Sequence, residues 1–152
     1  MMQLLIPLAV GIGGFVGAML RFYISSAINR VAGDELGFVG TLTVNLIGCF
    51  LIGTLAVVVL RTTHLSPHSQ RVLITGLLGS LTTFSTFALE CMNLLHSGRL
   101  GALTVNVVTN VVAGILLVWV GMQLAGMVFP KPAGEDSEFR RLSSETHSES
   151  EF

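Results

Sequence analysis

The densest run of polar residues in this chain covers residues 76–87, GLLGSLTTFSTF, inside an otherwise apolar stretch. The run holds two glycines, five hydroxyl residues and two phenylalanines. Glycine and threonine form helix less readily than leucine, so a break near residues 79–83 is expected. Carbonyls freed inside a membrane are tolerated only where they are buried in protein, line a cavity or bind an ion. A cation at this break is therefore a physical expectation, as in other discontinuous membrane helices.

Two phenylalanines and one acid follow in the same segment. Phe84 and Phe87 are three residues apart, so they share one face of a helix. Because the edge of an aromatic ring is electropositive, two such edges can contact a small anion, although such a pair is more often ordinary packing. Glu90 stands three residues further on, and an acid inside an apolar span is a functional candidate. It would serve a proton-coupled transporter, or it would hydrogen-bond the backbone near the break.

Three asparagines stand inside other apolar stretches. The amide of Asn45 can donate two hydrogen bonds, either to an anion or to a neighbouring helix, and the sequence chemistry favours neither role. Asn106 and Asn110 are four residues apart, with Thr109 beside them, and form a polar stripe on one helix face. Such a stripe lines an aqueous path or holds two helices together.

The first apolar stretch carries one charge, Arg21. Gly13 and Gly17 precede it as a small-xxx-small pair, which favours close helix packing. An arginine at membrane depth is unfavourable unless it extends to the interface or faces a polar interior. Arg21 is therefore either an interfacial arginine near a helix end or an anion-attracting or structural charge at a pore vestibule.

Composition and hydropathy indicate the elements that position these residues. Of 152 residues, 51% are hydrophobic and 11% are charged, against about 25% charged in soluble domains. A helix needs roughly 20 mostly apolar residues to cross the hydrocarbon core. Four segments meet this requirement: residues 4–28, 38–60, 72–95 and 100–127. The sequence predicts an all-α membrane protein with one four-helix domain, residues 1–129, and a broken third helix.

The charges are unevenly distributed. Residues 1–130 hold five arginines and three acids, whereas residues 131–152 hold three basic and six acidic residues. No large basic patch exists, so nucleic-acid binding is not expected. The Ser- and Glu-rich tail, residues 130–152, is too polar to form a core and is predicted to be disordered. Cys49 and Cys91 lie in apolar stretches and are expected to behave as small hydrophobes.

The arginines near the helix ends are balanced. Without the tail, Arg61 and Arg71 lie on one side of the predicted topology and Arg30 and Arg99 on the other. The positive-inside rule therefore specifies little orientation. Such a balance permits insertion in both orientations, which an antiparallel homodimer would need.

Three strings carry a resemblance to a known family: residues 14–21 (GFVGAMLR), 40–48 (GTLTVNLIG) and 79–87 (GSLTTFSTF). They resemble, in order, the signature stretches of the Fluc (CrcB) fluoride channels, and the similarity covers roughly residues 4–127. The third string is the most specific. The resemblance implies an antiparallel, dual-topology homodimer of four-helix subunits in the bilayer, with two fluoride pores at the dimer interface.

The resemblance also implies roles for individual residues. Phe84 and Phe87 would contact fluoride through their ring edges, and Asn45 would be the pore amide. The carbonyls of Gly79 and Thr82 from both subunits would hold a structural sodium ion at the dimer centre. The remaining positions would be the hydroxyls around the break, Thr82, Thr83, Ser85 and Thr86; the polar track, Asn106 and Asn110; a vestibule charge, Arg21; and Glu90 close to the break. Many members continue the track with a serine where this chain has Gly114.

The implied function is passive export of cytoplasmic fluoride across the inner membrane of a prokaryote. No catalysis is expected, because the sequence contains no nucleophile–base pair, metal-ligand spacing or phosphate-binding loop. One alternative is a small proton-coupled drug transporter, which would place an essential carboxylate in the first helix, where this chain has glycines and Arg21. A second alternative is a non-conducting helical assembly factor.

Overall fold

The computed structural model describes residues 2–33, 36–61 and 66–130. The predicted disordered tail lies outside the described residues. The first two spans are α1 (Met2–Ala32) and α2 (Val39–Arg61). The third span consists of α3 (Pro67–Arg71), the π-helix η2 (Val72–Leu78), α4 (Gly79–Leu81) and α5 (Phe84–His96). The fourth consists of α6 (Leu100–Val108), the π-helix η3 (Thr109–Ala113) and α7 (Gly114–Val128).

The described residues form four helical spans long and apolar enough to cross a membrane: Leu5–Ala32, Val39–Arg61, His68–His96 and Leu100–Val128. The predicted all-α architecture with four spans is confirmed. Two predicted ends were wrong, because α1 continues to Ala32 and the third span begins at Pro67. Ser66 explains the earlier start, since its Oγ accepts the Ser69 amide at 3.2 Å and caps the helix ahead of a proline in the first turn.

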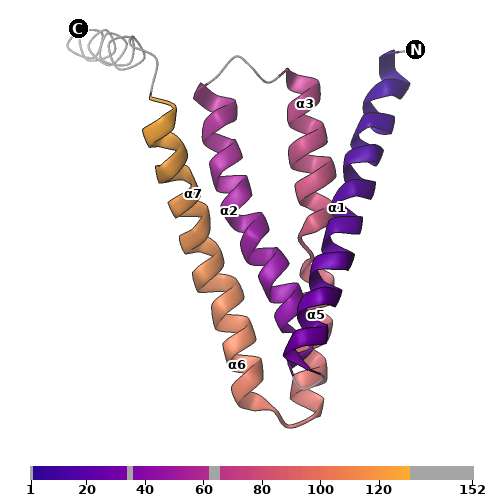
Figure 1. Ribbon diagram of the computed structural model, residues 1–152, viewed down its shortest axis with the longest axis vertical. Helices are drawn as coiled ribbons and strands as arrows, with labels where there is room; N and C mark the ends of the chain where they lie inside the picture. Colours follow the sequence, from indigo (N-terminus) through magenta and orange to yellow (C-terminus); the bar gives the residue numbers. More distant parts are fainter. Residues whose placement is uncertain (1, 34–35, 62–65, 131–152) are drawn as a thin grey trace, which may run out of the picture.

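The spans lie side by side in pairs (Figure 1), and glycines stand at their contacts. α2 lies along α7, while α1 lies against η2 and α4. An ideal Cβ at Gly17 would overlap the Leu77 carbonyl oxygen, and one at Gly53 would overlap the Val118 carbonyl oxygen. Absent side chains therefore let the backbones approach closely, as small residues commonly do between membrane helices.

The third span changes direction between α4 and α5. Thr82 (φ −83°, ψ 153°) and Thr83 (φ −150°, ψ 116°) have extended backbone. Thr83 caps the next helix, because its Oγ1 accepts the Thr86 amide at 3.3 Å. The two π-helical segments, η2 and η3, were not predicted; such segments are frequent at functional sites.

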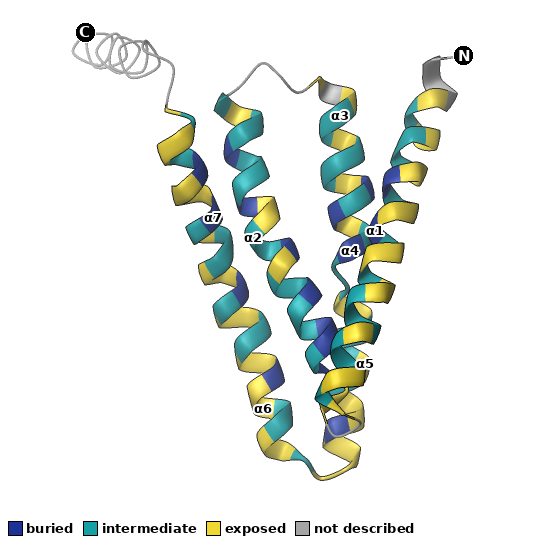
Figure 2. Cartoon of the chain, in the orientation of Figure 1, coloured by how far each residue is buried: buried dark blue, intermediate teal, exposed yellow. Residues whose placement is uncertain are grey.

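Little of the described chain is buried (Figure 2). Val44, Leu78 and Leu81 form a small core where α2 meets η2 and α4. The outward faces of α1, α5, α6 and α7 expose large apolar side chains, among them Phe15 and Trp119. Apolar exposure of this extent suits contact with lipid or with another chain rather than water.

Candidate functional site

Asn45 of α2 faces the backbone of the break. Its Oδ1 accepts a hydrogen bond from the Thr83 amide at 2.9 Å, and its Nδ2 donates to the Thr83 carbonyl at 3.3 Å. Both backbone groups of one extended residue are thus satisfied by a side chain instead of by a helical turn. Buried backbone groups need such partners inside a membrane, so Asn45 stabilises the break.

A chain of amides continues from Asn45 across to the fourth span. Asn45 Nδ2 also donates to Asn110 Oδ1 at 3.0 Å. Asn110 Nδ2 donates to Asn106 Oδ1 at 2.9 Å, and Asn106 Nδ2 lies 3.5 Å from Cys91 Sγ. Asn106 is fully buried. These bonds join α2 to the fourth span, while the role of the asparagines toward an anion stays a prediction.

Two carbonyls at the break lose their usual partners. In a continuous helix the Thr83 amide would donate to Gly79 O and the Thr86 amide to Thr82 O. Here the Thr83 amide donates to Asn45 Oδ1, and the Thr86 amide donates to Thr83 Oγ1. The oxygens of Gly79 and Thr82 are therefore candidate cation ligands by their chemistry.

The hydroxyls around the break divide into two groups. Thr82 Oγ1 donates to the Leu78 carbonyl at 3.1 Å, which directs it back onto the preceding helix. Thr83 Oγ1 lies 3.0 Å from Thr86 Oγ1 and 3.3 Å from Ser85 Oγ. Thr83, Ser85 and Thr86 therefore form a hydroxyl cluster at the start of α5.

The two phenylalanines contact each other, as their spacing predicts. Their ring centroids are 5.7 Å apart with the ring planes tilted by 52°. Phe84 is 78% exposed, whereas Phe87 is partly buried. The chain by itself places the Phe84 ring on its surface, so this ring is available to whatever packs against α5.

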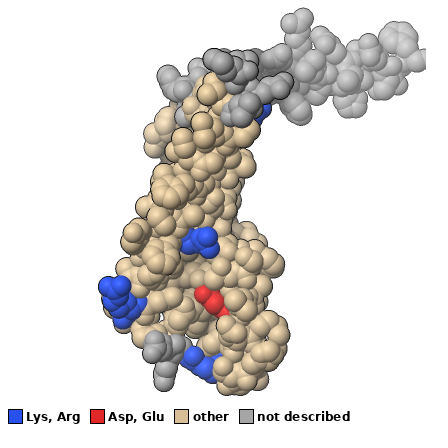
Figure 3. All heavy atoms as spheres, turned by 90° about the vertical axis from the view of Figure 1, so that its right-hand side faces the viewer, with Lys and Arg blue, Asp and Glu red and all other residues tan. Residues whose placement is uncertain are grey.

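Arg21 and Glu90 each have an unsatisfied atom. Glu90 Oε1 accepts a hydrogen bond from Thr41 Oγ1 at 2.5 Å, while Glu90 Oε2 and Arg21 Nε are buried without a hydrogen-bond partner. Glu90 therefore bonds to α2 and not to the backbone of the break. It is the only acid among the residues that the structure describes. On the face that Figure 3 shows, the acidic atoms lie among separate groups of arginine atoms.

Sequence reasoning missed two contacts of the site. Thr41, only 5% exposed, was not recognised as the partner of Glu90; the signal available was a hydroxyl residue just inside an apolar span. At Gly114 an ideal Cβ would lie 3.3 Å from Cys49 Sγ. The thiol therefore lies beside the position at which many family members are expected to carry serine.

Comparison with known proteins identifies the family to which this four-span chain belongs. The family described as CrcB-like protein, Camphor Resistance (CrcB), matches residues 8–122. The chain belongs to the CrcB family. A relative from a Sulfurovum species is 46% identical over 123 residues, covering 81% of this chain and 95% of the relative. One from Methylobacillus flagellatus is 39% identical over 118 residues, with 78% and 92% covered. Both relatives are named fluoride-specific ion channel FluC.

The CrcB match includes every residue singled out above. A further relative from Clostridium perfringens is 36% identical over 129 residues, covers 85% of this chain and is itself covered completely. It is also named fluoride-specific ion channel FluC. These names support the prediction of a CrcB-family channel rather than an enzyme. The proton-coupled transporter receives no support from them, and α1 has no acid within its sequence.

Proposed function

We propose that this chain is a fluoride-selective channel that lets cytoplasmic fluoride leave a prokaryotic cell by passive permeation. One observation carries the proposal. A hydrogen-bonded chain of amides, from the partly buried Asn45 and Asn110 to the fully buried Asn106, meets a helix break inside an apolar four-span body. Polar groups at that depth are functional candidates because their burial is unfavourable. The names of the relatives supply the permeant ion.

Fluoride must exchange its hydration shell for protein donors to pass a narrow pore, as selectivity requires. Both donor hydrogens of Asn45 are engaged, one by Thr83 O and one by Asn110 Oδ1. An arriving anion must therefore replace the acceptor in one of these two hydrogen bonds, because the Asn45 amide has no free donor. The hydroxyls and ring edges complete the path, through Thr82, Thr83, Ser85, Thr86, Phe84 and Phe87. Arg21 supplies a positive charge near the vestibule.

The working assembly is an antiparallel, dual-topology homodimer with two pores. The 78% exposure of Phe84 supports this assembly, because a pore ring on the surface of one chain needs a second surface to close the path. The balanced arginines near the helix ends support insertion in both orientations.

A sodium ion at the dimer centre fits the chemistry of the break. Oxygens of unwound backbone coordinate sodium in other broken membrane helices. Gly79 and Thr82 supply two carbonyls whose usual amide partners donate elsewhere, and a second copy would supply two more. When bound, the ion neutralises these dipoles and links the two subunits.

The proposal is tested with purified protein in liposomes loaded with fluoride. Fluoride efflux that an imposed proton gradient does not change, together with exclusion of chloride, is the expected result. Exchange of an organic cation against protons would establish the transporter class instead. Absence of any flux from protein that is monodisperse and inserted would indicate a non-conducting assembly factor.

A further inference from the structure

A cavity of about 350 Å³, lined by both polar and apolar residues, opens at the end of the bundle where α5 turns into α6. Its wall changes from exposed to buried with depth. Gly37, Asn93 and Ser97 are exposed, whereas Phe38 and Leu94 are 6% and 7% exposed. The seven lining residues are Gly37, Phe38, Glu90, Asn93, Leu94, Ser97 and Arg99. The cavity therefore leads from the α5–α6 end of the bundle toward Glu90.

The inner end of this cavity adjoins the proposed path. Glu90 lines the cavity and bonds through Oε1 to Thr41 of α2. Thr41 stands one helical turn before Asn45, and residues four apart lie on one helix face. An anion that reaches Glu90 is thus one turn of α2 away from the amide chain.

The backbone of Arg99 is held on both sides. Gly98 has a positive φ of 69°, which turns the chain sharply after α5. The Arg99 amide then donates to the Leu94 carbonyl at 2.9 Å, and the Arg99 carbonyl accepts the Leu103 amide at 3.0 Å. The guanidinium consequently projects from a fixed point on the cavity wall.

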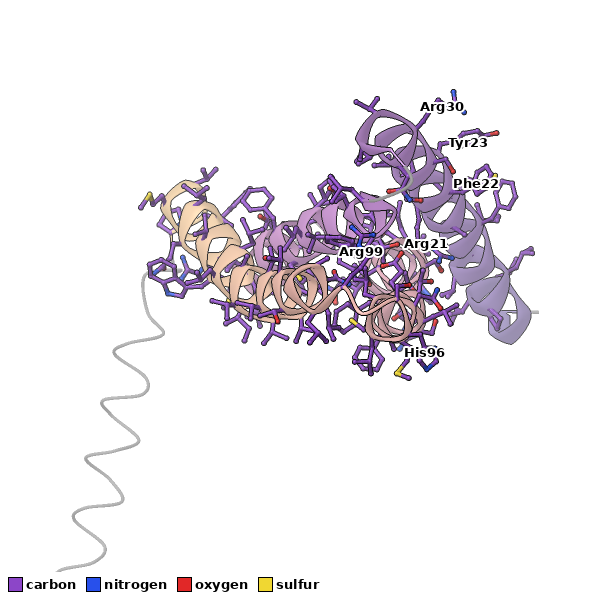
Figure 4. The ribbon with its side chains drawn as sticks, turned by 90° about the horizontal axis from the view of Figure 1, so that it is seen from below. Arg21, Phe22, Tyr23, Arg30, His96 and Arg99 are labelled. Carbon is purple, nitrogen blue, oxygen red and sulfur yellow. The ribbon has the colours of Figure 1, made fainter. Side chains whose placement is uncertain are left out.

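The two charged residues of the cavity, Glu90 and Arg99, have opposite charges but do not form an ion pair. Glu90 Oε2 has no hydrogen-bond partner, so the Arg99 guanidinium does not bond to that oxygen. Seen from this end, Arg99 and Arg21 lie over the middle of the bundle, whereas Arg30 and His96 lie at its edge (Figure 4). Without Arg99, the cavity would hold the carboxylate alone among its charged groups and would repel anions.

We infer that this cavity is the mouth through which fluoride reaches the amide path, and that Arg99 is the charge that attracts it and offsets Glu90. The inference rests on the proposed function. A charged cleft with low-dielectric walls raises the local concentration of ions of opposite sign and their rate of arrival. Rings of arginine or lysine serve anion pores in this way. Arg99 would act before permeation and would contribute little once the mouth is saturated.

The test compares fluoride efflux from liposomes at low fluoride and low ionic strength. Arg99→Gln is expected to lower the flux roughly three- to tenfold, and added impermeant salt is expected to narrow that difference, as for electrostatic steering. Arg99→Lys keeps the charge and restores most of the flux. Arg30→Gln is the matched control, because Arg30 is exposed in the last turn of α1 and does not line the cavity. It is expected to match the wild type.

A second variant makes the test independent of Arg99 itself. Asn93→Asp adds a negative charge on the exposed rim of the same cavity and is expected to lower flux about twofold or more, again less at high salt. Wild-type flux with an unchanged salt dependence in both Arg99→Gln and Asn93→Asp would overturn the inference that this cavity is the fluoride entrance. The proposed channel function would be unaffected. Absence of fluoride flux in the wild type would overturn both.

Discussion

Helical segments come into close contact both along the α2–α7 pair and at the α4–α5 break, but the contacts differ in kind. Along α2 and α7, glycine brings backbone onto backbone: a Cβ at Gly53 would overlap the Val118 carbonyl oxygen. At the break, a polar side chain, Asn45, replaces the missing helical bonds of Thr83. The glycine contacts place no polar side chain between the helices, whereas at the break the amides that would bond to the Gly79 and Thr82 carbonyls donate elsewhere.

We call the α2–α7 pair the frame and the α4–α5 break with Asn45 the pathway. The frame has its backbone hydrogen bonds within helices, so nothing in it needs an ion or a water molecule. The break has backbone oxygens at Gly79 and Thr82 whose amide partners donate elsewhere. Backbone oxygens of this kind are tolerated at membrane depth only where they are buried in protein, line a cavity or bind an ion. Mutations in the frame are therefore expected to change stability first, and mutations at the break to change conduction first.

The largest expected effect is in the frame. Gly53→Ala places a methyl group against the Val118 carbonyl oxygen, so α2 and α7 must separate. We expect a loss of roughly 3 kcal/mol in the free energy of unfolding, the upper range for overpacking, with a fall in melting temperature in detergent. Gly11→Ala is the control, because nothing lies within 4 Å of a Cβ there. Equal melting temperatures for the two variants would show that the α2–α7 contact does not hold the frame.

At the break, Asn45→Leu removes both hydrogen bonds to Thr83 and the bond to Asn110. A buried backbone group left without a partner costs about 1–3 kcal/mol, and we expect fluoride flux to fall more than about tenfold, which corresponds to 1.4 kcal/mol. Thr43→Val on the same helix is the control, since Thr43 Oγ1 donates to the Val39 carbonyl one turn back. Flux in Asn45→Leu equal to that of Thr43→Val would remove Asn45 from the pathway.

The ring positions sharpen the comparison because they should affect conduction alone. Phe84→Ile and Phe87→Ile are expected to cut fluoride flux about tenfold, the loss of roughly one favourable contact, without changing the size-exclusion profile of the proposed dimer. Phe84 is 78% exposed in the chain, so its replacement opens no core cavity. Phe15→Ile, at a ring that is 67% exposed on α1, is the control. Wild-type flux in both ring variants contradicts the assignment of ring-edge contacts.

The frame was more predictable from the sequence than the break. Hydropathy alone identifies four spans, because a span needs only length and apolar composition. The helix ends were less certain, since Ser66 and Pro67 look equally like a connection and like the cap and first turn that they form. The π-helical segments η2 and η3 left no signal, because a single wide turn changes neither the composition nor the length of a span.

At the candidate site, residue types were predictable but partners were not. Asn45 was equally consistent with an anion contact and a helix contact, because an amide donates to either. Its bonds to Thr83 and Asn110 join residues far apart in sequence, and only the packing of three spans fixes them. The pairing of Glu90 with Thr41 depends in the same way on how α2 lies against α5.

Sodium removal tests whether the free carbonyls of the break hold an ion that the frame does not need. Exchange of sodium for N-methylglucamine is expected to destabilise the proposed dimer by about 1.4 kcal/mol if sodium was present at ten times its dissociation constant. The fraction of cross-linked dimer and the fluoride flux are the measurements. The melting temperature of Gly53→Ala relative to wild type should stay the same in either cation. A dimer and a flux indifferent to the exchange count against a sodium site at Gly79 and Thr82.

The smallest effect is expected at the α5–α6 turn, where neither glycine packing nor the amide chain operates. Gly98 has a φ of 69° and nothing lies within 4 Å of a Cβ placed there, so only backbone strain opposes a side chain. Gly98→Ala should cost about 1 kcal/mol, the penalty of a left-handed conformation for an L-residue. Gly101→Ala, three residues later in α6 and equally open, should instead gain about 0.5–1 kcal/mol from helix propensity. Melting temperatures that shift in opposite directions would show that backbone strain, and not a lack of space for the methyl group, opposes the Gly98 substitution. A loss in both variants would mean that an unrecognised neighbour packs against this turn.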